Sequence, residues 1–375
     1  MKTIVEYGGL KRLNELKNIY SGKKIFLVTG KASYENSGAK NIVDQYLVGE
    51  QVVHFKEFST NPKISDALAG TRLARQHEIE VIIAIGGGSV IDIAKLIKAF
   101  YLANDNEIEL VTGTHKVSDP SIPIIAIPTT AGSGSEATHF AVIYLGSDKY
   151  SLAATCLLPE VVILDGSLVR TGSTYLKACN SLDAMSQAIE SYWAVGATDV
   201  SRKYAKDALQ LGWSLLPHYV NGGCTDLQAQ KMLEAAHLAG KAINISKTTA
   251  AHAWSYAFTS AYNIPHGHAV WLTLPAIFDA HFNATAEEII EPKGFSYFKT
   301  IMAELCNYLS LDMDVNLRMQ LKQFLLSIGV ESRMEQLGAS TLKNKTDLSN
   351  QVNIERLNNN PVNLNGKKSL IFNLC

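Results

Sequence analysis

The sequence predicts an α/β domain in residues 1–172 followed by an almost entirely helical domain in residues 173–375. A chain of 375 residues is longer than one hydrophobic core usually supports, so we expect two domains. Up to about residue 170 the apolar runs are short, rich in Val and Ile, and separated by helical or turn-like stretches, which is typical of a mostly parallel sheet. After about residue 174 longer segments of helical period replace them. No low-complexity linker separates the two patterns, so we expect a tight junction.

Apolar runs and helical periods locate the individual elements. In the first domain the apolar runs predict strands at residues 24–29, 51–55, 81–85, 122–127 and 161–164. Covering helices are expected at residues 65–77 and 90–103. In the second domain the periodicity predicts long helices at residues 182–192, 201–216 and 226–243. The asparagine-rich residues 350–365 are expected to form a short helix followed by a loose tail.

Composition and charge exclude several classes of protein. With 47% hydrophobic and 18% charged residues, the chain has the composition of a globular protein rather than a disordered one. The net charge of -1 argues against a nucleic-acid or anionic membrane surface, because both need a concentrated positive field. Widely spaced cysteines predict neither a thiolate metal site nor a disulfide framework, and no apolar run approaches the ~18 residues that span a bilayer. We therefore expect a cytoplasmic protein without signal peptide or membrane anchor, whose partner is a small molecule.

A glycine-rich turn follows the predicted strand at residues 81–85. Gly86, Gly87 and Gly88, followed by Ser89, connect this buried strand to an apolar helix that contains Asp92. Without side chains, the backbone can approach a pyrophosphate, whose charge is met by free N–H groups at the helix N-terminus. The spacing is not the GxGxxG of the usual dinucleotide fingerprint, and a plain tight turn is the alternative.

A second polar turn follows the strand at residues 122–127. It carries five hydroxyl residues, namely Thr129, Thr130, Ser133, Ser135 and Thr138. Ligands of open α/β sheets gather at this end of the strands, and the hydroxyls could bond phosphates, ribose or a carboxamide. Helix capping in an ordinary polar loop would account for one or two hydroxyls rather than five. Together the two turns predict nucleotide binding.

The second domain carries the residues suited to chemistry. Asp183, Gln187 and Glu190 stand at i, i+4 and i+7 and so share one face of a predicted helix. On a later helix His252 and Tyr256 share a face. Two more histidines, His266 and His268, follow within a few residues.

Histidines that cluster with an aspartate from another helix are the material of a divalent metal site with an open position. A lone histidine on an apolar helix is more often a core residue, so the seven remaining histidines are interpreted as core or surface residues. The clustering of His252, His266 and His268 therefore sets them apart.

Together these motifs resemble the iron-containing (group III) alcohol dehydrogenase family, a relative of dehydroquinate synthase and the glycerol dehydrogenases. The resemblance covers nearly the whole chain and rests on Tyr7-Gly8-Gly9-Leu10, Asn61-Pro62, Gly86 to Asp92, Pro128 to Glu136 and Pro265-His266-Gly267. It implies a dehydroquinate synthase-like fold, with a Rossmann-like first domain and a helical second domain. It also implies a homodimer that transfers a hydride between NAD(P)H and a small aldehyde or alcohol, with a divalent metal polarising the carbonyl.

The resemblance assigns metal ligands residue by residue. The family's metal positions correspond to Asp183, Gln187, His252 and His266, so three ligands are kept and one histidine has become Gln. An amide oxygen binds borderline ions less well than imidazole does, so we expect weakened affinity for Fe(II) or Zn(II). His268 is a candidate compensating ligand or proton donor. Tyr256 stands where the family often has a further histidine, and it is either a proton donor or a core aromatic.

The resemblance also assigns cofactor contacts. Gly86, Gly87, Gly88, Ser89 and Asp92 correspond to the pyrophosphate region; Thr129, Thr130, Ser133 and Thr138 surround the nicotinamide half, and Lys149 lies beyond them. NAD-preferring members often carry an acid at the position of Gly30, where a carboxylate bonds the ribose hydroxyls and repels a 2′-phosphate. Its absence, together with Lys31, favours NADP(H) over NAD(H), and use of both stays open.

The segment leading to His252 indicates an anionic substrate. It contains Lys241, Lys247 and several hydroxyl residues, and it resembles the phosphonoacetaldehyde reductase branch of the family. Such residues bind phosphonate or carboxylate groups, although both lysines are equally well explained as solvated helix residues. Two rival functions remain. One is a lyase of the dehydroquinate synthase type, and the other is a metal-less nucleotide-binding protein without turnover, which Gln187 and Tyr256 would favour.

Overall fold

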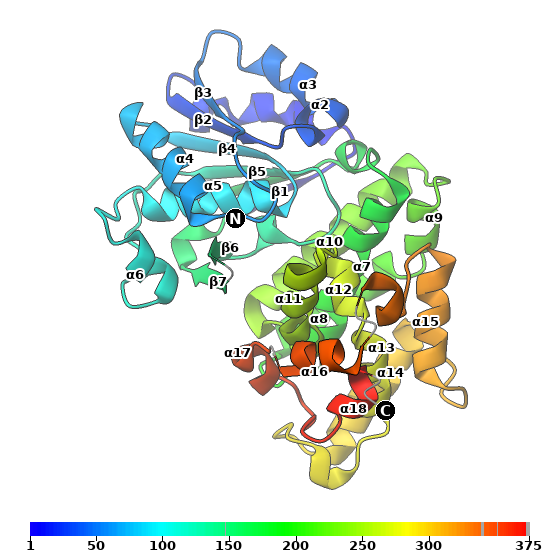
Figure 1. The fold of residues 1–375 in the computed structure, drawn as a ribbon. Helices are drawn as coiled ribbons and strands as arrows, with labels where there is room; N and C mark the ends of the chain where they lie inside the picture. Colours follow the sequence, from blue (N-terminus) through cyan, green and yellow to red (C-terminus); the bar gives the residue numbers. More distant parts are fainter. Residues whose placement is uncertain (147, 339–340, 351, 373–375) are drawn as a thin grey trace. The chain divides into compact units, whose positions relative to one another are not determined.

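A computed structural model describes residues 1–146, 148–338, 341–350 and 352–372 of the chain (Figure 1). The described chain divides into two compact units. The first unit comprises Met1–Gly172 and Thr225–His237, and the second comprises Ser173–Cys224 and Leu238–Cys375. The segment 225–237 belongs to a helix that the sequence placed wholly in the second domain, and the boundary at residues 172 and 173 stays a prediction.

The first unit is built on a six-stranded parallel sheet with the strand order β1-β8-β5-β4-β2-β3. Its strands are β1 (Lys2–Val5), β2 (Lys24–Thr29), β3 (Gln51–Phe55), β4 (Val81–Gly86), β5 (Ile124–Pro128) and β8 (Val161–Leu164). An antiparallel hairpin of β6 (Phe140–Leu145) and β7 (Asp148–Ala153) follows β5. All-parallel strands are buried on both faces, and this explains why β4, β5 and β8 are continuous apolar runs.

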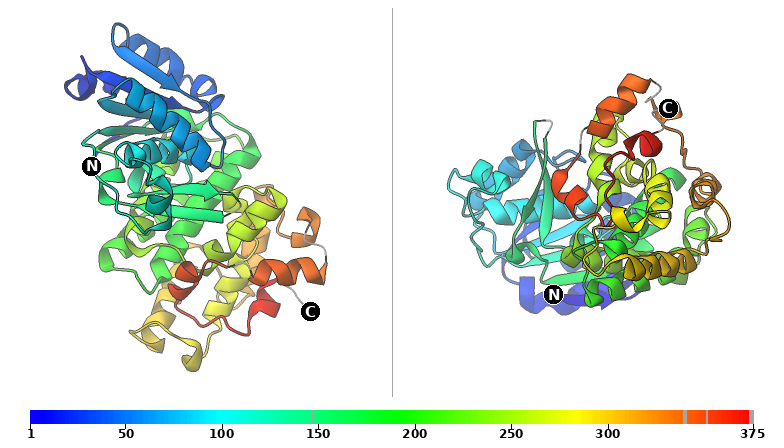
Figure 2. Two further views of the ribbon diagram at one scale, coloured as in Figure 1. Left: turned by 60° about the vertical axis from the view of Figure 1, so that its left-hand side comes forward. Right: turned by 90° about the horizontal axis from the view of Figure 1, so that it is seen from below.

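Helices cover both faces of this sheet (Figures 1 and 2). One face carries Ile25, Ile83 and Ile125, which join a core with the short helices near the N-terminus. On the other face α5 packs on β4 and α4 packs on α5. The helices of the first unit are η1 (Gly9–Leu16), α1 (Lys17–Tyr20), α2 (Ser33–Asn36), α3 (Ala39–Tyr46), α4 (Ile64–Gln76), α5 (Gly88–Phe100) and α6 (Glu107–Thr112), with the short turns η2 (Ser135–Ala137), η3 (Thr155–Leu157) and η4 (Gly166–Val169).

The second unit is helical throughout its described residues, apart from loops and one isolated bridge. Its longer helices are α7 (Thr174–Trp193), α8 (Asp199–Gly212), α10 (Asp226–Ser246, shared with the first unit), α11 (Ala250–Tyr262), α13 (Leu274–Phe282), α14 (Phe295–Tyr308) and α15 (Leu317–Ser327). The shorter ones are α9 (Leu216–Val220), α12 (His266–Trp271), η5 (Ala286–Glu288), η6 (Met334–Leu337), α16 (Leu342–Asn350), α17 (Ile354–Asn358) and α18 (Lys368–Phe372). No helix in the described ranges combines the length and apolarity needed to cross a bilayer.

The predicted fold class, an α/β unit followed by a helical one, is confirmed. The bounds of β2, β3 and β8 match the predicted strands, whereas β1 and the β6–β7 hairpin were not predicted. The helix predicted at residues 201–216 is wrong in its second part, since α8 ends at Gly212 and a new helix, with Pro217 in its first turn, begins at Leu216.

The loose tail predicted after residue 350 is also wrong for the described residues. The chain forms α17 and α18 there, and the asparagines fasten it to the helical unit. Asn359 donates from Nδ2 to the carbonyl of Ser246 at 2.8 Å. Asn360 is fully buried, and its Nδ2 lies 3.0 Å from Nε2 of His281. These asparagines act as hydrogen-bonding anchors rather than as loop formers.

Candidate active site

The two polar turns of the first unit lie side by side at the carboxyl ends of β4 and β5. The strands pair in parallel with Gly86 opposite Pro128, and the N–H of Thr129 donates to the carbonyl of Gly86 at 3.0 Å. The glycine-rich turn and the hydroxyl-rich turn therefore form one surface at the edge where ligands of open α/β sheets bind.

Glycine is required in the first turn because the second turn lies against it. A Cβ on Gly88 would lie 2.4 Å from the hydroxyl of Ser133, and a Cβ on Gly87 would lie 3.3 Å from the hydroxyl of Thr130. The helix α5 begins at Gly88, and no described side chain caps its N-terminus. Its N–H groups and positive end are thus presented to an anion, as a pyrophosphate requires.

The hydroxyl-rich turn contains an unsatisfied polar atom. Thr129 is 5% exposed, and its Oγ1 has no hydrogen-bond partner among the described residues. Burying a hydroxyl without a partner is costly, so this atom fits a site completed by a ligand. The orphaned hydroxyl and the glycine cradle together fit a dinucleotide.

Several predicted cofactor contacts have partners inside the protein. Asp92 accepts hydrogen bonds from the hydroxyl of Ser135 at 2.5 Å and from the N–H of Val142 at 3.2 Å, and burial raises the pKa of its carboxyl. Thr138 is 1% exposed and its hydroxyl lies 3.1 Å from Nζ of Lys95. The hydroxyl of Ser89 donates to a backbone carbonyl in the preceding loop. These side chains hold the turns together, which leaves their backbone as the part able to meet a ligand.

The predicted specificity residues lie at the end of β2. A Cβ on Gly30 would lie 2.3 Å from the hydroxyl of Ser33, so the chain is tightly folded there. Nζ of Lys31 forms an exposed ion pair with Glu57 at 2.8 Å. Lys149 lies on β7, and its charge acts on the pKa of Asp92.

Three of the four predicted metal ligands form a cluster in the second unit. Asp183, His252 and His266 each offer one ligand atom within 4.8 Å of the others. Oδ1 of Asp183 lies 3.5 Å from Nε2 of His252 and 3.9 Å from Nε2 of His266. Two ligands that each lie about 2.1 Å from one ion can be up to about 4.2 Å apart, so these separations fit a divalent metal.

The environment of the cluster also fits a cation. His252 is 4% exposed, and its Nε2 forms no hydrogen bond within the described residues. Burial lowers the pKa of His252, but the carboxylates of Glu190 and Asp183 outweigh burial and raise it to about 9. The same two carboxylates favour a metal ion as they favour a proton. His266 keeps 30% of its side chain exposed and so leaves one side of the cluster open.

A glycine allows the helices that carry these ligands to meet. A Cβ on Gly267 would lie 1.9 Å from the carbonyl oxygen of Cys179 and 2.8 Å from the N–H nitrogen of Asp183, so α12 touches the backbone of α7. The indole of Trp271 fixes the same contact by donating to the carbonyl of Leu182 at 2.8 Å. This close approach brings His266, at the start of α12, next to Asp183.

Glu190 orients His252, a role that the sequence analysis did not assign although it placed Glu190 on the same face as Asp183. Glu190 is fully buried and accepts a hydrogen bond from Nδ1 of His252. It also accepts from the hydroxyl of Thr249 at 2.7 Å and from the N–H of Ala251 at 2.8 Å. A carboxylate on Nδ1 fixes the ring tautomer and leaves Nε2 as the ligand atom.

The remaining predicted residues differ in where they lie. Gln187 is buried one turn after Asp183 on the same helix. Tyr256 is half-buried, and its ring stacks on His266 with centroids 5.8 Å apart. His268 is not part of the cluster, because Nδ1 lies 2.8 Å from the hydroxyl of Tyr175 and Nε2 lies 2.6 Å from the carbonyl of Glu331.

The two lysines expected near the substrate have other contacts. Nζ of Lys241 lies 4.5 Å from the ring centre of Tyr204, and Lys247 forms an ion pair with Glu355. Neither contact involves a residue of the metal cluster. The structure therefore provides no direct link between these lysines and the cluster.

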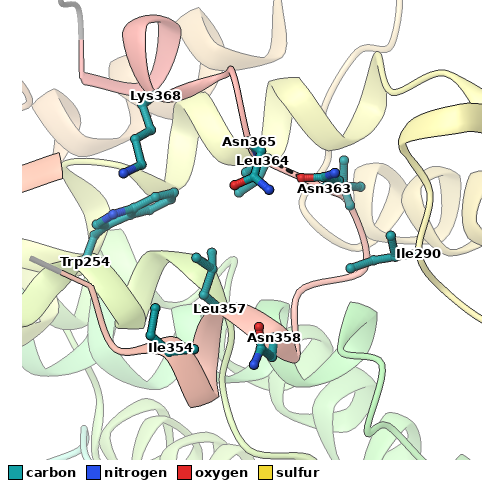
Figure 3. Close-up of a pocket in the computed structure, with 10 residues that line it drawn as sticks. Trp254, Ile290, Ile354, Leu357, Asn358, Asn363, Leu364, Asn365 and Lys368 are labelled. Atoms are coloured by element: carbon teal, nitrogen blue, oxygen red, sulfur yellow. Dashed lines mark hydrogen bonds between the residues drawn. The ribbon is translucent and has the colours of Figure 1, made fainter. Parts of the chain in front are cut away.

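Figure 3 shows a pocket of about 550 Å³ in the second unit. Trp254, Ile354 and Leu357 line it together with asparagines and Lys368. None of its lining residues belongs to the metal cluster, and none is an acid or a histidine. It therefore offers no residue for metal binding or proton transfer.

A dinucleotide-type turn on a parallel sheet and an Asp/His/His cluster on helices define a metal-dependent oxidoreductase architecture. The family described as iron-containing alcohol dehydrogenase matches residues 1–166, and the Fe-containing alcohol dehydrogenase family, C-terminal, matches residues 177–370. The chain belongs to the iron-containing alcohol dehydrogenase family.

Individual relatives support the same family. The probable alcohol dehydrogenase EutG of Escherichia coli (strain K12) is 34% identical over 220 residues, which are 58% of this chain and 55% of the relative. The chain thus aligns with about half the length of that relative. The NADPH-dependent butanol dehydrogenase of Clostridium saccharobutylicum is 29% identical over 91% of this chain and 88% of its own length. The sulfoacetaldehyde reductase of Bifidobacterium kashiwanohense, solved in complex with NAD+, has a TM-score of 0.86 and 26% identity, covering 100% of this chain and 96% of that one.

Proposed function

We propose that this protein is an NAD(P)-dependent alcohol dehydrogenase, or aldehyde reductase, that transfers a hydride between the cofactor and a small aldehyde or alcohol. The observation that carries the proposal is the cluster of Asp183, His252 and His266, backed by Glu190, in a chain of this family. Relatives whose names specify alcohol or aldehyde oxidoreduction support it. The family description favours hydride transfer over a lyase reaction.

We propose that Asp183, His252 and His266 hold a divalent ion, with Gln187 as a weaker fourth ligand. The ion supplies a Lewis acid that polarises the substrate carbonyl. Asp183 contributes negative charge, and Glu190 keeps Nε2 of His252 available as a ligand atom. Iron is proposed rather than zinc, since the matching family is described as iron-containing.

Proton transfer to the product oxygen is assigned to Tyr256. Its phenol ring is half-buried and stacked on His266, so the hydroxyl is held next to the metal ligands. His268 is left out of this role because both of its ring nitrogens have partners elsewhere. Tyr256→Phe should lower kcat and leave the metal content unchanged.

The cofactor is proposed to bind on the two turns of the first unit. Backbone N–H groups of Gly86 to Ser89 meet the pyrophosphate, and the orphaned hydroxyl of Thr129 meets the nicotinamide half together with Thr130 and Ser133. NADP(H) is favoured over NAD(H) because Gly30 brings no carboxylate and Lys31 lies beside it. One relative is NADPH-dependent by name and one was solved with NAD+, so the family provides for both cofactors.

The substrate is proposed to be a short aldehyde with an anionic group. Support comes from the similarity to a sulfoacetaldehyde reductase, which is also consistent with the phosphonoacetaldehyde reductase-like branch. Lys241 and Lys247 add little to this argument, because their charged ends contact Tyr204 and Glu355. A homodimer in the cytoplasm completes the proposal, and light scattering of the purified protein tests the dimer.

The deciding experiment combines metal analysis with turnover. Protein purified without chelators under anaerobic conditions is assayed for bound iron and for oxidation of NADPH and NADH with neutral and anionic short aldehydes. Asp183→Asn serves as the control, since it should lose metal and turnover but keep dinucleotide binding. Dinucleotide binding without turnover of any carbonyl would overturn the proposal in favour of a metal-less nucleotide-binding protein.

A further inference from the structure

Lys95 is a buried cation in the first unit whose role goes beyond helix formation. It lies on α5, two turns after the glycine cradle, and its side chain is fully buried. Its Nζ donates to three backbone carbonyls, those of Ser135 at 2.5 Å, Thr138 at 2.7 Å and Phe140 at 2.9 Å. An ammonium group has three donor hydrogens, so the three carbonyls satisfy it.

The burial of this cation would be costly without such partners. Burial lowers the pKa of Lys95 to about 8, although the nearby carboxylates of Asp92 and Glu136 oppose the shift. Glu136 is itself buried and lies 3.1 Å from Nδ1 of His237. These contacts form a buried polar network beneath the segment 135–140.

The network fixes the segment that directly follows the hydroxyl-rich turn. Asp92, three residues before Lys95, accepts hydrogen bonds from Ser135 and from the N–H of Val142. One turn of α5 therefore anchors both ends of this segment. The same helix begins at Gly88, where the hydroxyl of Ser133 lies in the space that a Cβ would occupy. The position of the hydroxyl-rich turn relative to the cradle thus depends on α5.

We infer that Lys95 is a positioning residue for cofactor binding, which holds the hydroxyl-rich turn so that Thr129, Thr130 and Ser133 face the nicotinamide half of the dinucleotide. This inference rests on the proposed function of the two turns. The glycine cradle stands on the backbone of β4 and α5 and does not need Lys95. Removing the cation should therefore weaken contacts to the nicotinamide half and leave those to the ADP half.

The chain offers a matched control on the same helix. Lys98 is also fully buried on α5, and its Nζ donates to Glu160 at 2.9 Å. Glu160 in turn accepts from the N–H of Ile124 at 2.6 Å, at the amino end of β5. Lys98 is thus a buried lysine anchored at the opposite end of the strands from the cradle.

The test compares the dissociation constants of NADPH, NADH and ADP-ribose, which lacks the nicotinamide, for the wild type, Lys95→Met and Lys98→Met. For Lys95→Met we expect NADPH and NADH to bind about tenfold more weakly, the size of one lost hydrogen bond to a charged group. ADP-ribose should bind within about twofold of the wild type. Lys98→Met should bind all three ligands as the wild type does.

Two results overturn the inference: unchanged NADPH and NADH binding by Lys95→Met, or an equal loss of ADP-ribose binding. If Lys95→Met does not fold, Ser135→Ala decides the question. It removes the hydroxyl that bonds Asp92 and should shift NADPH binding in the same direction by about threefold; an unchanged constant overturns the inference. Failure of the wild type to bind either dinucleotide would instead overturn the proposed function.

Discussion

The dinucleotide turns of the first unit and the metal cluster of the second unit are each organised by a buried charge, but their binding groups differ. The turns present backbone N–H groups and hydroxyls from two short segments, and the cation of Lys95 lies beneath them. The cluster presents side chains from three helices, and the anion of Glu190 orients one of them. A backbone site is therefore sensitive to any added Cβ, whereas a side-chain site is sensitive to the identity of each ligand.

Glu190→Gln should have the largest effect on the cluster. Glutamine keeps an oxygen for Thr249 and Ala251 but loses the negative charge beside Nδ1 of His252. Loss of such a partner typically weakens metal binding about 10–100-fold. Competition with a chelator, using Co(II) as a spectroscopic probe, measures the change independently of turnover.

Glu304→Gln is the control for this substitution. Glu304 is a half-buried carboxylate of the same unit that accepts from the hydroxyl of Tyr192 at 2.5 Å. It should bind Co(II) as the wild type does. Wild-type affinity in Glu190→Gln would show that the buried anion does not organise the cluster.

Gly88→Ala should have the next largest effect, on the first unit. The new Cβ would lie 2.4 Å from the hydroxyl of Ser133, so the hydroxyl-rich turn must move. We expect NADPH and NADH to bind about tenfold more weakly, as measured by quenching or enhancement of the cofactor fluorescence. Gly223→Ala is the control, since a Cβ there meets nothing within 4 Å. Unchanged cofactor binding by Gly88→Ala would contradict the close contact between the two turns.

The same difference between backbone and side-chain sites explains what the sequence could predict. The strands β2, β3 and β8 were predicted at their observed bounds, and β2 and β8 are short apolar runs buried along nearly their whole length. The two polar turns were visible because each lies within one contiguous segment. The hairpin β6–β7 was missed because many of its residues are partly exposed, so they lack such a run.

The residues that organise the two sites could not be predicted in the same way. Lys95 has the sequence context of an ordinary helical lysine, and only the fold shows the three carbonyls around its Nζ. Glu190 was placed on the correct helix face, but its contact with His252 joins residues 62 apart in the sequence. His268 attracted attention through its neighbours, whereas its contacts with Tyr175 and Glu331 depend on tertiary packing.

Gln187→His tests the one ligand position where the chain departs from the family pattern. Gln187 follows Asp183 by one helical turn, so a histidine there can share the same ion. Because imidazole binds borderline divalent ions better than an amide oxygen, we expect Co(II) to bind about five- to tenfold more tightly. Gln187→Leu, which offers no ligand atom, should bind more weakly than the wild type. Equal affinities in all three proteins would show that this position is not a metal ligand.

Lys31→Met should have the smallest effect, because the lysine is exposed and already paired with Glu57 at 2.8 Å. An exposed charge contact contributes up to about 1 kcal/mol, so we expect NADPH to bind about fivefold more weakly and NADH to bind unchanged. Lys40→Met is the control, since Lys40 forms a similar exposed ion pair with Asp44 at 2.9 Å. Equal weakening of NADPH and NADH would mean that Lys31 does not recognise the 2′-phosphate, and the proposed preference for NADP(H) would lose its main support. The adenosine end of the first site would then depend on backbone contacts alone, as its pyrophosphate region does.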